Sequence, residues 1–181
     1  MKFIPTKIEG VVIIEPNVFE DSRGFFYESY RKDEFSKNGI HGEFVQDNRS
    51  RSVKGVLRGL HYQLAPHEQA KLVSVVSGKA FDVAVDIRPG SKTFGCYVSE
   101  ILTAENKKMI YIPAGLAHGF LSLADGTELL YKVSKPYSPA HERGIVWNDS
   151  QIAIPWPKLE VDYVISEKDK KFIQLKDIAK K

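Results

Sequence analysis

Short apolar runs alternate with turn residues along most of the chain. The runs are rich in β-branched and aromatic side chains and are bounded by Gly, Pro, Asn, Asp and Ser, a pattern typical of β-strands. We expect strands at residues 10–16, 25–30, 43–50, 57–63, 80–88, 96–102 and 108–113. Residues 119–124 and 127–133 flank an Asp-Gly dipeptide, which predicts a tight hairpin.

Only two segments favour helix. Residues 31–38 are polar apart from Phe35 and end at an Asn-Gly pair, which suits a short helix. A second helix is expected to begin near Ser166 as N-cap, with Asp169 at its third position. Strands joined by short turns, without long helices between them, favour an antiparallel all-β sandwich or barrel of jelly-roll type. With 181 residues and 43% hydrophobic content, we expect a single domain over residues 1–181.

Residues 80–88 alternate strictly between two kinds of side chain. Phe81, Val83, Val85 and Ile87 fall on one face, and Asp82, Ala84, Asp86 and Arg88 fall on the other. We therefore expect one face to pack and the other to be polar.

Charge and cysteine content narrow the functional classes. The chain has 26 Lys+Arg against 23 Asp+Glu, a net charge of +3, which does not favour nucleic acid or an anionic membrane as a partner. Cys96 is the only cysteine, so no intrachain disulfide can form. No apolar signal-peptide core is found at residues 1–10, and we expect a cytoplasmic protein.

Residues 57–63, LRGLHYQ, combine a cation, an imidazole and an amide within a strand-like segment. A stretch selected only for packing would carry apolar side chains at these positions. We therefore interpret residues 57–63 as one wall of a catalytic pocket. Alternation places His61 and Gln63 on one face and Arg58 on the other. If Arg58 and His61 share a pocket, the strand should bulge near Gly59.

Two segments, residues 55–78 and 113–118, resemble the half-motifs of the cupin superfamily, a small jelly roll. Metal-binding cupins take two histidines and a glutamate from the first half and a third histidine from the second. Here His61 and His118 remain, while Gln63 stands in place of the second histidine of the pair.

The position of the cupin glutamate can be assigned in two ways. Counting forward from His61 selects Glu68, whereas counting back from Gly78 selects Lys71. We favour Lys71, because residues 65–67 look like a loop insertion. An ammonium repels a metal ion and an amide oxygen binds transition metals weakly, so we expect a pocket without a metal.

Blocks spread over nearly the whole chain, in order, resemble the dTDP-4-dehydrorhamnose 3,5-epimerase family. They are EDSRGFFYES, FVQDN, RGLHYQ, AKLV, FDVAVDIR, IPAGLAHGF, LLYK, WNDSQIAIPWP and SEKDK. The resemblance implies inversion of C3 and C5 in dTDP-4-keto-6-deoxy-D-glucose, giving dTDP-4-keto-L-rhamnose, with no cofactor and no metal.

The resemblance also implies roles for individual residues. His61 is the base, Asp169 orients its ring, Tyr131 is the acid on the opposite face of the sugar, and Lys71 stabilises the enolate. Arg23 and Arg58 suit the pyrophosphate and Tyr137 the thymine. The substrate-binding residues that it implies are Arg23, Phe26, Glu28, Gln46, Asp47, Asn48, Arg58, Lys71, His118, Tyr137, Glu142 and Lys168.

In this family the N-terminal segment crosses to a partner subunit, so we expect a homodimer in which Arg23, Phe26 and Glu28 complete the neighbour's site. Three alternatives stay open. The first is a relative that inverts C3 alone, and the second is one that moves the ketone to C3. The third is a metal-dependent cupin using His61, Glu68 and His118, either a dioxygenase or a non-catalytic sugar-binding module.

Overall fold

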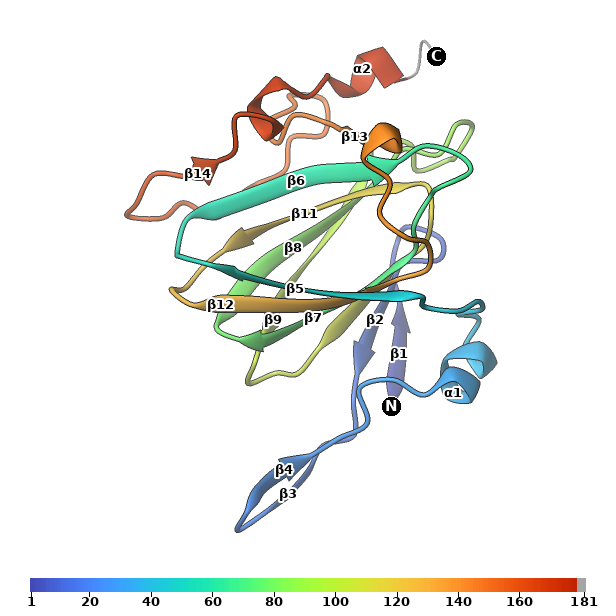
Figure 1. Cartoon of the computed structure of the whole chain (residues 1–181), viewed down its shortest axis with the longest axis vertical. Coiled ribbons are helices and arrows are strands. Elements are labelled where there is room, and N and C mark those ends of the chain that lie inside the picture. The colour runs from blue at the N-terminus through green and yellow to red at the C-terminus, as the bar shows by residue number, and fades with distance from the viewer. Residues whose placement is uncertain (179–181) are drawn as a thin grey trace.

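The computed structural model describes residues 1–178 and consists of two β-sheets packed face to face (Figure 1). The first sheet has six strands in the order β1–β2–β10–β7–β12–β5, all antiparallel. These strands are β1 (Lys2–Pro5), β2 (Val12–Glu15), β10 (Met109–Ile112), β7 (Lys71–Ser77), β12 (Thr127–Val133) and β5 (Gln46–Ser52).

The second sheet has the order β13–β6–β11–β8–β9, and β14 joins β6 in parallel. Its strands are β13 (Glu142–Gly144), β6 (Val56–Gln63), β11 (Leu116–Ser122), β8 (Lys79–Asp86), β9 (Tyr97–Thr103) and β14 (Val164–Ile165). The remaining elements are a hairpin of β3 (Phe19–Asp21) and β4 (Gly24–Phe26), the helices α1 (Lys32–Lys37) and α2 (Leu175–Ile178), and the 3₁₀ turns η1 (Pro139–His141) and η2 (Asp169–Lys171).

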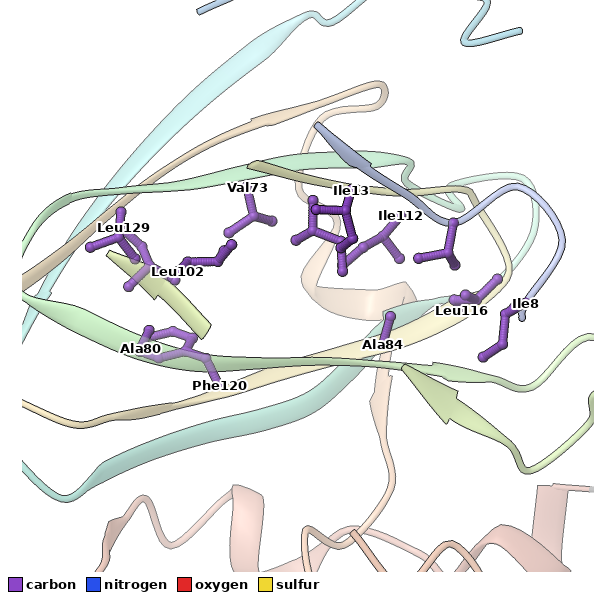
Figure 2. Close-up of a cluster of buried hydrophobic side chains, with 13 residues drawn as sticks. Ile8, Ile13, Val73, Ala80, Ala84, Leu102, Ile112, Leu116, Phe120 and Leu129 are labelled. Carbon is purple, nitrogen blue, oxygen red and sulfur yellow. The ribbon is translucent and has the colours of Figure 1, made fainter. Parts of the chain in front are cut away.

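The main hydrophobic core fills the space between the sheets. In Figure 2, side chains of the first sheet such as Val73 and Ile13 face Ala84 and Phe120 of the second, and all four are buried. Burying an aliphatic side chain of this size contributes roughly 1.5–3 kcal/mol. The apolar core does not extend to the end of the sandwich where β5, β6, β7, β11 and β12 meet. Polar side chains lie between the sheets there and line a pocket.

A second cluster covers the outer face of the second sheet. The C-terminal segment, drawn in red above β6 in Figure 1, packs there with both tryptophans. Trp156 also donates a hydrogen bond from Nε1 to the carbonyl of Trp147 at 2.8 Å. This packing fixes the segment that carries Asp169 against β6. No helix within residues 1–178 is long and apolar enough to cross a membrane.

Most of the expected strands and the first helix are confirmed. Helix α1 is followed by Gly39 at φ +80°, as the Asn-Gly signal predicted. The second helix is reduced to the single turn η2, whose N-cap is Lys168 and not Ser166; the Oγ of Ser166 nevertheless accepts a hydrogen bond from the backbone N–H of Asp169 at 3.1 Å.

Two expectations are wrong. The segments around Asp125-Gly126 do not pair, because β11 lies in the second sheet and β12 in the first, so the turn crosses between layers. The strand expected at 25–30 ends at Phe26, and Tyr30 instead packs edge-on against Phe35. The two faces of β8 follow the expected division: Phe81, Val83 and Val85 pack in the outer cluster, while the polar face carries Asp82 and Asp86, which are completely buried.

Candidate active site

A bulge in β6 brings Arg58 and His61 to one pocket, as the sequence predicted. On β11, His118 lies opposite His61 and Phe120 lies opposite Arg58, so β6 has one residue more than β11 over this interval. Both Arg58 and His61 line the pocket between the sheets. The intervening Leu60 packs into the cluster on the outer face of the sheet.

Glycine is required at the bulge. Gly59 has φ +121°, a region that L side chains rarely adopt. A Cβ there would lie 2.6 Å from Cα of Gly119 and 2.8 Å from the carbonyl oxygen of His118. The close contact between β6 and β11, on which the position of His61 depends, therefore leaves no room for a side chain.

Asp169 holds the ring of His61. Its Oδ1 lies 2.9 Å from Nε2 of His61, and its Oδ2 accepts a hydrogen bond from the backbone N–H of Gly59 at 3.0 Å. Burial by itself would raise the pKa of Asp169, but the hydrogen bonds and charge of its partners, His61 first, outweigh it and lower that pKa below its ordinary value. An ionised carboxylate accepts a hydrogen bond, so neutral His61 has its proton on Nε2 and its lone pair on Nδ1.

Lys71 and Tyr131 come from the first sheet and line the pocket together with His61 of the second. Burial lowers the pKa of Lys71 to about 8, against the opposing effect of Asp82 and Glu142. Burial raises the pKa of the Tyr131 phenol, while Arg58 lowers it and Glu142 raises it. The pocket thus places a cation that is easily deprotonated and a protonated phenol on the wall opposite the imidazole. Lys71 lines this pocket and Glu68 does not, which is consistent with the preference for Lys71 at the cupin glutamate position.

His118 forms a second imidazole–carboxylate pair, with Nε2 at 2.9 Å from Oδ2 of the buried Asp82. Burial lowers the pKa of His118, although Asp82 opposes this effect. A neutral ring therefore points into the pocket wall. Sequence reasoning missed Asp82 as a site residue. The strict alternation of residues 80–88, which placed Asp82 on the polar face of the strand, is the sequence feature that could have identified it.

Three residues form a charged cluster at the rim of the pocket. The phenol of Tyr137 donates to Oε2 of Glu142 at 2.7 Å, and Nζ of Lys168 donates to both carboxylate oxygens at 2.9 and 3.0 Å. Burial alone would raise the pKa of Glu142, but these two partners lower it. The glutamate is therefore ionised and holds both neighbours in place.

Strand β5 contributes alternate residues to the site. Gln46 and Asn48 line the pocket, whereas Asp47 points to the other face, where it pairs with Lys132 at 3.0 Å. Asp47 was expected among the substrate-binding residues, but it does not line this pocket, because successive side chains of a strand face opposite ways. Ser50, which sequence reasoning missed, lines the pocket, and its buried Oγ has no hydrogen-bond partner among residues 1–178.

Arg23, Phe26 and Glu28 lie far from the pocket of their own chain. The β3–β4 hairpin projects away from the sandwich (Figure 1), and Phe26 on it is 66% exposed. Arg23 pairs with Asp21 at 2.6 Å, and Glu28 pairs with Arg31 at 3.1 Å. Among the described residues no three His, Cys, Asp or Glu side chains gather as metal ligands would.

Comparison with known proteins gives one consistent result. A family model described as dTDP-4-dehydrorhamnose 3,5-epimerase matches residues 5–177. The dTDP-4-dehydrorhamnose 3,5-epimerase of Escherichia coli (strain K12) is 49% identical over 181 residues, 99% of this chain and 97% of that protein. The enzyme of Pseudomonas aeruginosa is 52% identical over 171 residues, 94% of this chain and 93% of that one.

Solved structures agree. The 3,5-epimerase RmlC of Legionella pneumophila in complex with dTDP-4-keto-L-rhamnose has 49% identity and a TM-score of 0.93, over 97% of this chain and 93% of that one. The rmlC epimerase of Mycobacterium tuberculosis has 39% identity and a TM-score of 0.95, over 98% and 90%. This likeness confirms the all-β, cupin-type jelly-roll sandwich that the sequence predicted.

Proposed function

The chain belongs to the dTDP-4-dehydrorhamnose 3,5-epimerase family, and on this premise we propose that its pocket binds dTDP-4-keto-6-deoxy-D-glucose and inverts both C3 and C5. The enzyme is an isomerase of nucleotide sugars. The observation that carries the proposal is the 2.9 Å contact between His61 on β6 of the second sheet and Asp169 of η2, beside a pocket that His61 lines together with Tyr131 of the first sheet.

The proposed chemistry is two proton transfers at each centre. The C4 carbonyl acidifies the hydrogens on C3 and C5, and Nδ1 of His61 removes one of them, which leaves an enolate. Asp169 supports the imidazolium that results. Tyr131 then delivers its proton to the opposite face of the same carbon, so the centre is inverted. The phenolate regains a proton from solvent and His61 releases the one it took, which restores both groups.

Charge at O4 of the sugar increases as the enolate forms. We assign its stabilisation to the ammonium of Lys71, because a fixed cation in a water-poor pocket interacts strongly with a developing oxyanion. The neutral His118, whose Nε2 faces Asp82, lines the same pocket and is assigned to sugar binding. The assignment is consistent with the low pKa of Lys71, since a cation that the free protein solvates poorly gains most from a counter-charge.

Nucleotide binding is assigned to the outer part of the site. Arg58 is assigned to the pyrophosphate and Tyr137 to stacking on the base. Glu142 and Lys168 are assigned to positioning Tyr137 and the phosphate groups of the nucleotide. Gln46 and Asn48 supply amides on the β5 side of the pocket.

We further propose a homodimer in which the β3–β4 hairpin reaches the partner's pocket with Arg23, Phe26 and Glu28. The support is that the hairpin leaves the sandwich and exposes Phe19, Phe25 and Phe26 by 60% or more, which is unusual unless a partner covers them. The single cysteine, Cys96, fits the expected cytoplasmic location.

Solvent exchange tests the reaction. With dTDP-4-keto-6-deoxy-D-glucose in deuterated water, the product should carry deuterium at C3 and at C5. Label at C3 alone would instead establish a C3 epimerase. The His61→Asn variant should lose exchange at both carbons, while Tyr131→Phe should keep some exchange but lose inversion. Turnover by His61→Asn equal to that of the original chain would overturn the assignment of the base.

A further inference from the structure

Gln63 stands where metal cupins have a ligand, but its amide is used for backbone contacts. The side chain is 7% exposed. Its Oε1 accepts a hydrogen bond from the backbone N–H of Ser138 at 2.7 Å, and its Nε2 donates to the carbonyl of His67 at 2.6 Å. The same Nε2 lies 3.4 Å from the carbonyl of Pro136. The partners fix the orientation of the amide, because an N–H requires the oxygen and a carbonyl requires the nitrogen.

These contacts surround one residue. Pro136 and Ser138 flank Tyr137, so Gln63 binds the backbone on both sides of it. The backbone N–H of Tyr137 itself donates to Oε1 of Gln46 at 3.1 Å. Gln63 belongs to β6 of the second sheet and Gln46 to β5 of the first. The segment that carries Tyr137 is therefore held from both sheets across the mouth of the pocket.

We propose that Gln63 is a positioning residue that acts through Tyr137, fixing its backbone so that the phenol stands over the pocket mouth. This inference depends on the proposed function, in which Tyr137 stacks on the nucleotide base. The neutral amide offers an acceptor to Ser138 and a donor to His67 from one terminal group, which an ionised glutamate cannot do because its carboxylate only accepts. An ordered loop lowers the entropic cost of nucleotide binding, and Gln63 should affect binding more than chemistry.

A double-mutant cycle with dTDP as the probe tests this inference. The variants are Gln63→Met, Tyr137→Ala and the double variant, with the dissociation constant of dTDP measured by calorimetry. Gln63→Met should weaken binding about tenfold, the effect of one or two lost hydrogen bonds. In the Tyr137→Ala background the same change should have less than a twofold effect, because the residue it positions is gone. At saturating substrate, kcat of Gln63→Met should stay within about threefold while KM rises.

Asn106 offers a matched control, because its amide also holds backbone and it does not line the pocket. Its Nδ2 donates to the carbonyl of Ile101 at 2.8 Å, and its Oδ1 accepts from the backbone N–H of Thr103 at 3.1 Å. Asn106→Leu should change dTDP affinity less than twofold. If Gln63→Met does not fold, Gln63→Glu carries the same test, since its carboxylate still accepts from Ser138 but cannot donate to His67.

Three outcomes would overturn the inference. Additive effects in the cycle would mean that Gln63 contacts the ligand directly. A lower midpoint of thermal unfolding with unchanged dTDP affinity would mean that it only stabilises the fold. Equal affinity of the original chain and Tyr137→Ala would remove the stacking role of Tyr137 as well, and so would count against the proposed function, whereas the first two outcomes leave that function intact.

Discussion

The carboxylate of Asp169 binds β6 at two points, the imidazole of His61 through Oδ1 and the backbone of Gly59 through Oδ2. One side chain thus fixes both the orientation of the ring and the bulge that turns the ring into the pocket. The contact spans more than a hundred positions of sequence, 108 to His61 and 110 to Gly59. The packing of the C-terminal segment on the second sheet is therefore a condition for an assembled site.

Replacing Asp169 by Asn should remove most of the activity. The amide is almost isosteric, but it either presents a donor to Nε2 or accepts weakly, so the tautomer with its lone pair on Nδ1 is no longer favoured. We expect kcat to fall by up to about 10⁴, the loss found when the aspartate of the serine-protease imidazole pair is replaced by asparagine. The steady-state rate with the 4-keto sugar measures it. Glu167→Gln, in which a nearby surface carboxylate loses its pairing with Lys170, should keep kcat within twofold; equal losses in both variants would contradict the assignment.

The charge of Lys71 should set the alkaline limit of activity. Its pKa of about 8 means that the free protein loses this cation as the pH rises through 8, and kcat/KM should fall there. Tyr131 cannot cause that fall, because its pKa is raised above the ordinary value of 10. In Lys71→Arg the alkaline limb should move upward, even if the maximum rate drops. A limb at the same pH in both proteins would show that another group controls it.

Lys71 should also reduce the stability of the fold at neutral pH. Its folded pKa of about 8 lies below the ordinary 10.5, so between these values the unfolded chain binds more protons and the free energy of unfolding rises with pH. Below pH 8 the destabilisation is fully present. Lys71→Met should therefore raise the free energy of unfolding at pH 7 by up to about 3 kcal/mol. Urea denaturation at pH 7 and at pH 10 measures it, and a gain that does not shrink at pH 10 would contradict the linkage.

The sequence predicted the fold class, the bulge and the residues of the catalytic pair for identifiable reasons. The bulge followed from a conflict between strand alternation and the need for Arg58 and His61 in one pocket. The hairpin at Asp125-Gly126 was wrong because turn chemistry specifies a reversal of the chain and not the sheet that the next strand joins. The resemblance named Gln46, Asp47 and Asn48 together as one motif, but a strand places neighbouring side chains on opposite faces, so Asp47 lies away from the pocket that the other two line.

Asp82 and Ser50 were missed for a related reason. A carboxylate or hydroxyl in an alternating strand normally faces solvent, and only the packing of two sheets reveals that this face lines an internal pocket. Tertiary structure, not local pattern, decides which polar face is enclosed.

Gly59→Ala should destabilise the fold far more than Gly24→Ala. Both glycines have φ above +120°, but a Cβ at Gly24 meets nothing within 4 Å, whereas one at Gly59 overlaps the backbone of β11. The φ strain alone costs about 1–2 kcal/mol, and the overlap at Gly59 should bring the total to about 4 kcal/mol or more. Thermal unfolding of the two variants provides the comparison. Similar losses would show that β6 and β11 can separate at the bulge without disturbing the fold.

Ser50→Ala should separate binding from stability. The Oγ of Ser50 is buried in the pocket without a partner among residues 1–178, and such a group costs roughly 1 kcal/mol unless a ligand satisfies it. Alanine should therefore raise the free energy of unfolding slightly and raise KM about three- to tenfold, because the sugar or phosphate oxygen that Ser50 meets loses its hydrogen bond. In the matched variant Ser74→Ala, where Oγ donates to the carbonyl of Leu130 at 3.0 Å, stability should fall and KM should stay constant. An unchanged KM in Ser50→Ala would show that solvent, not substrate, satisfies this hydroxyl.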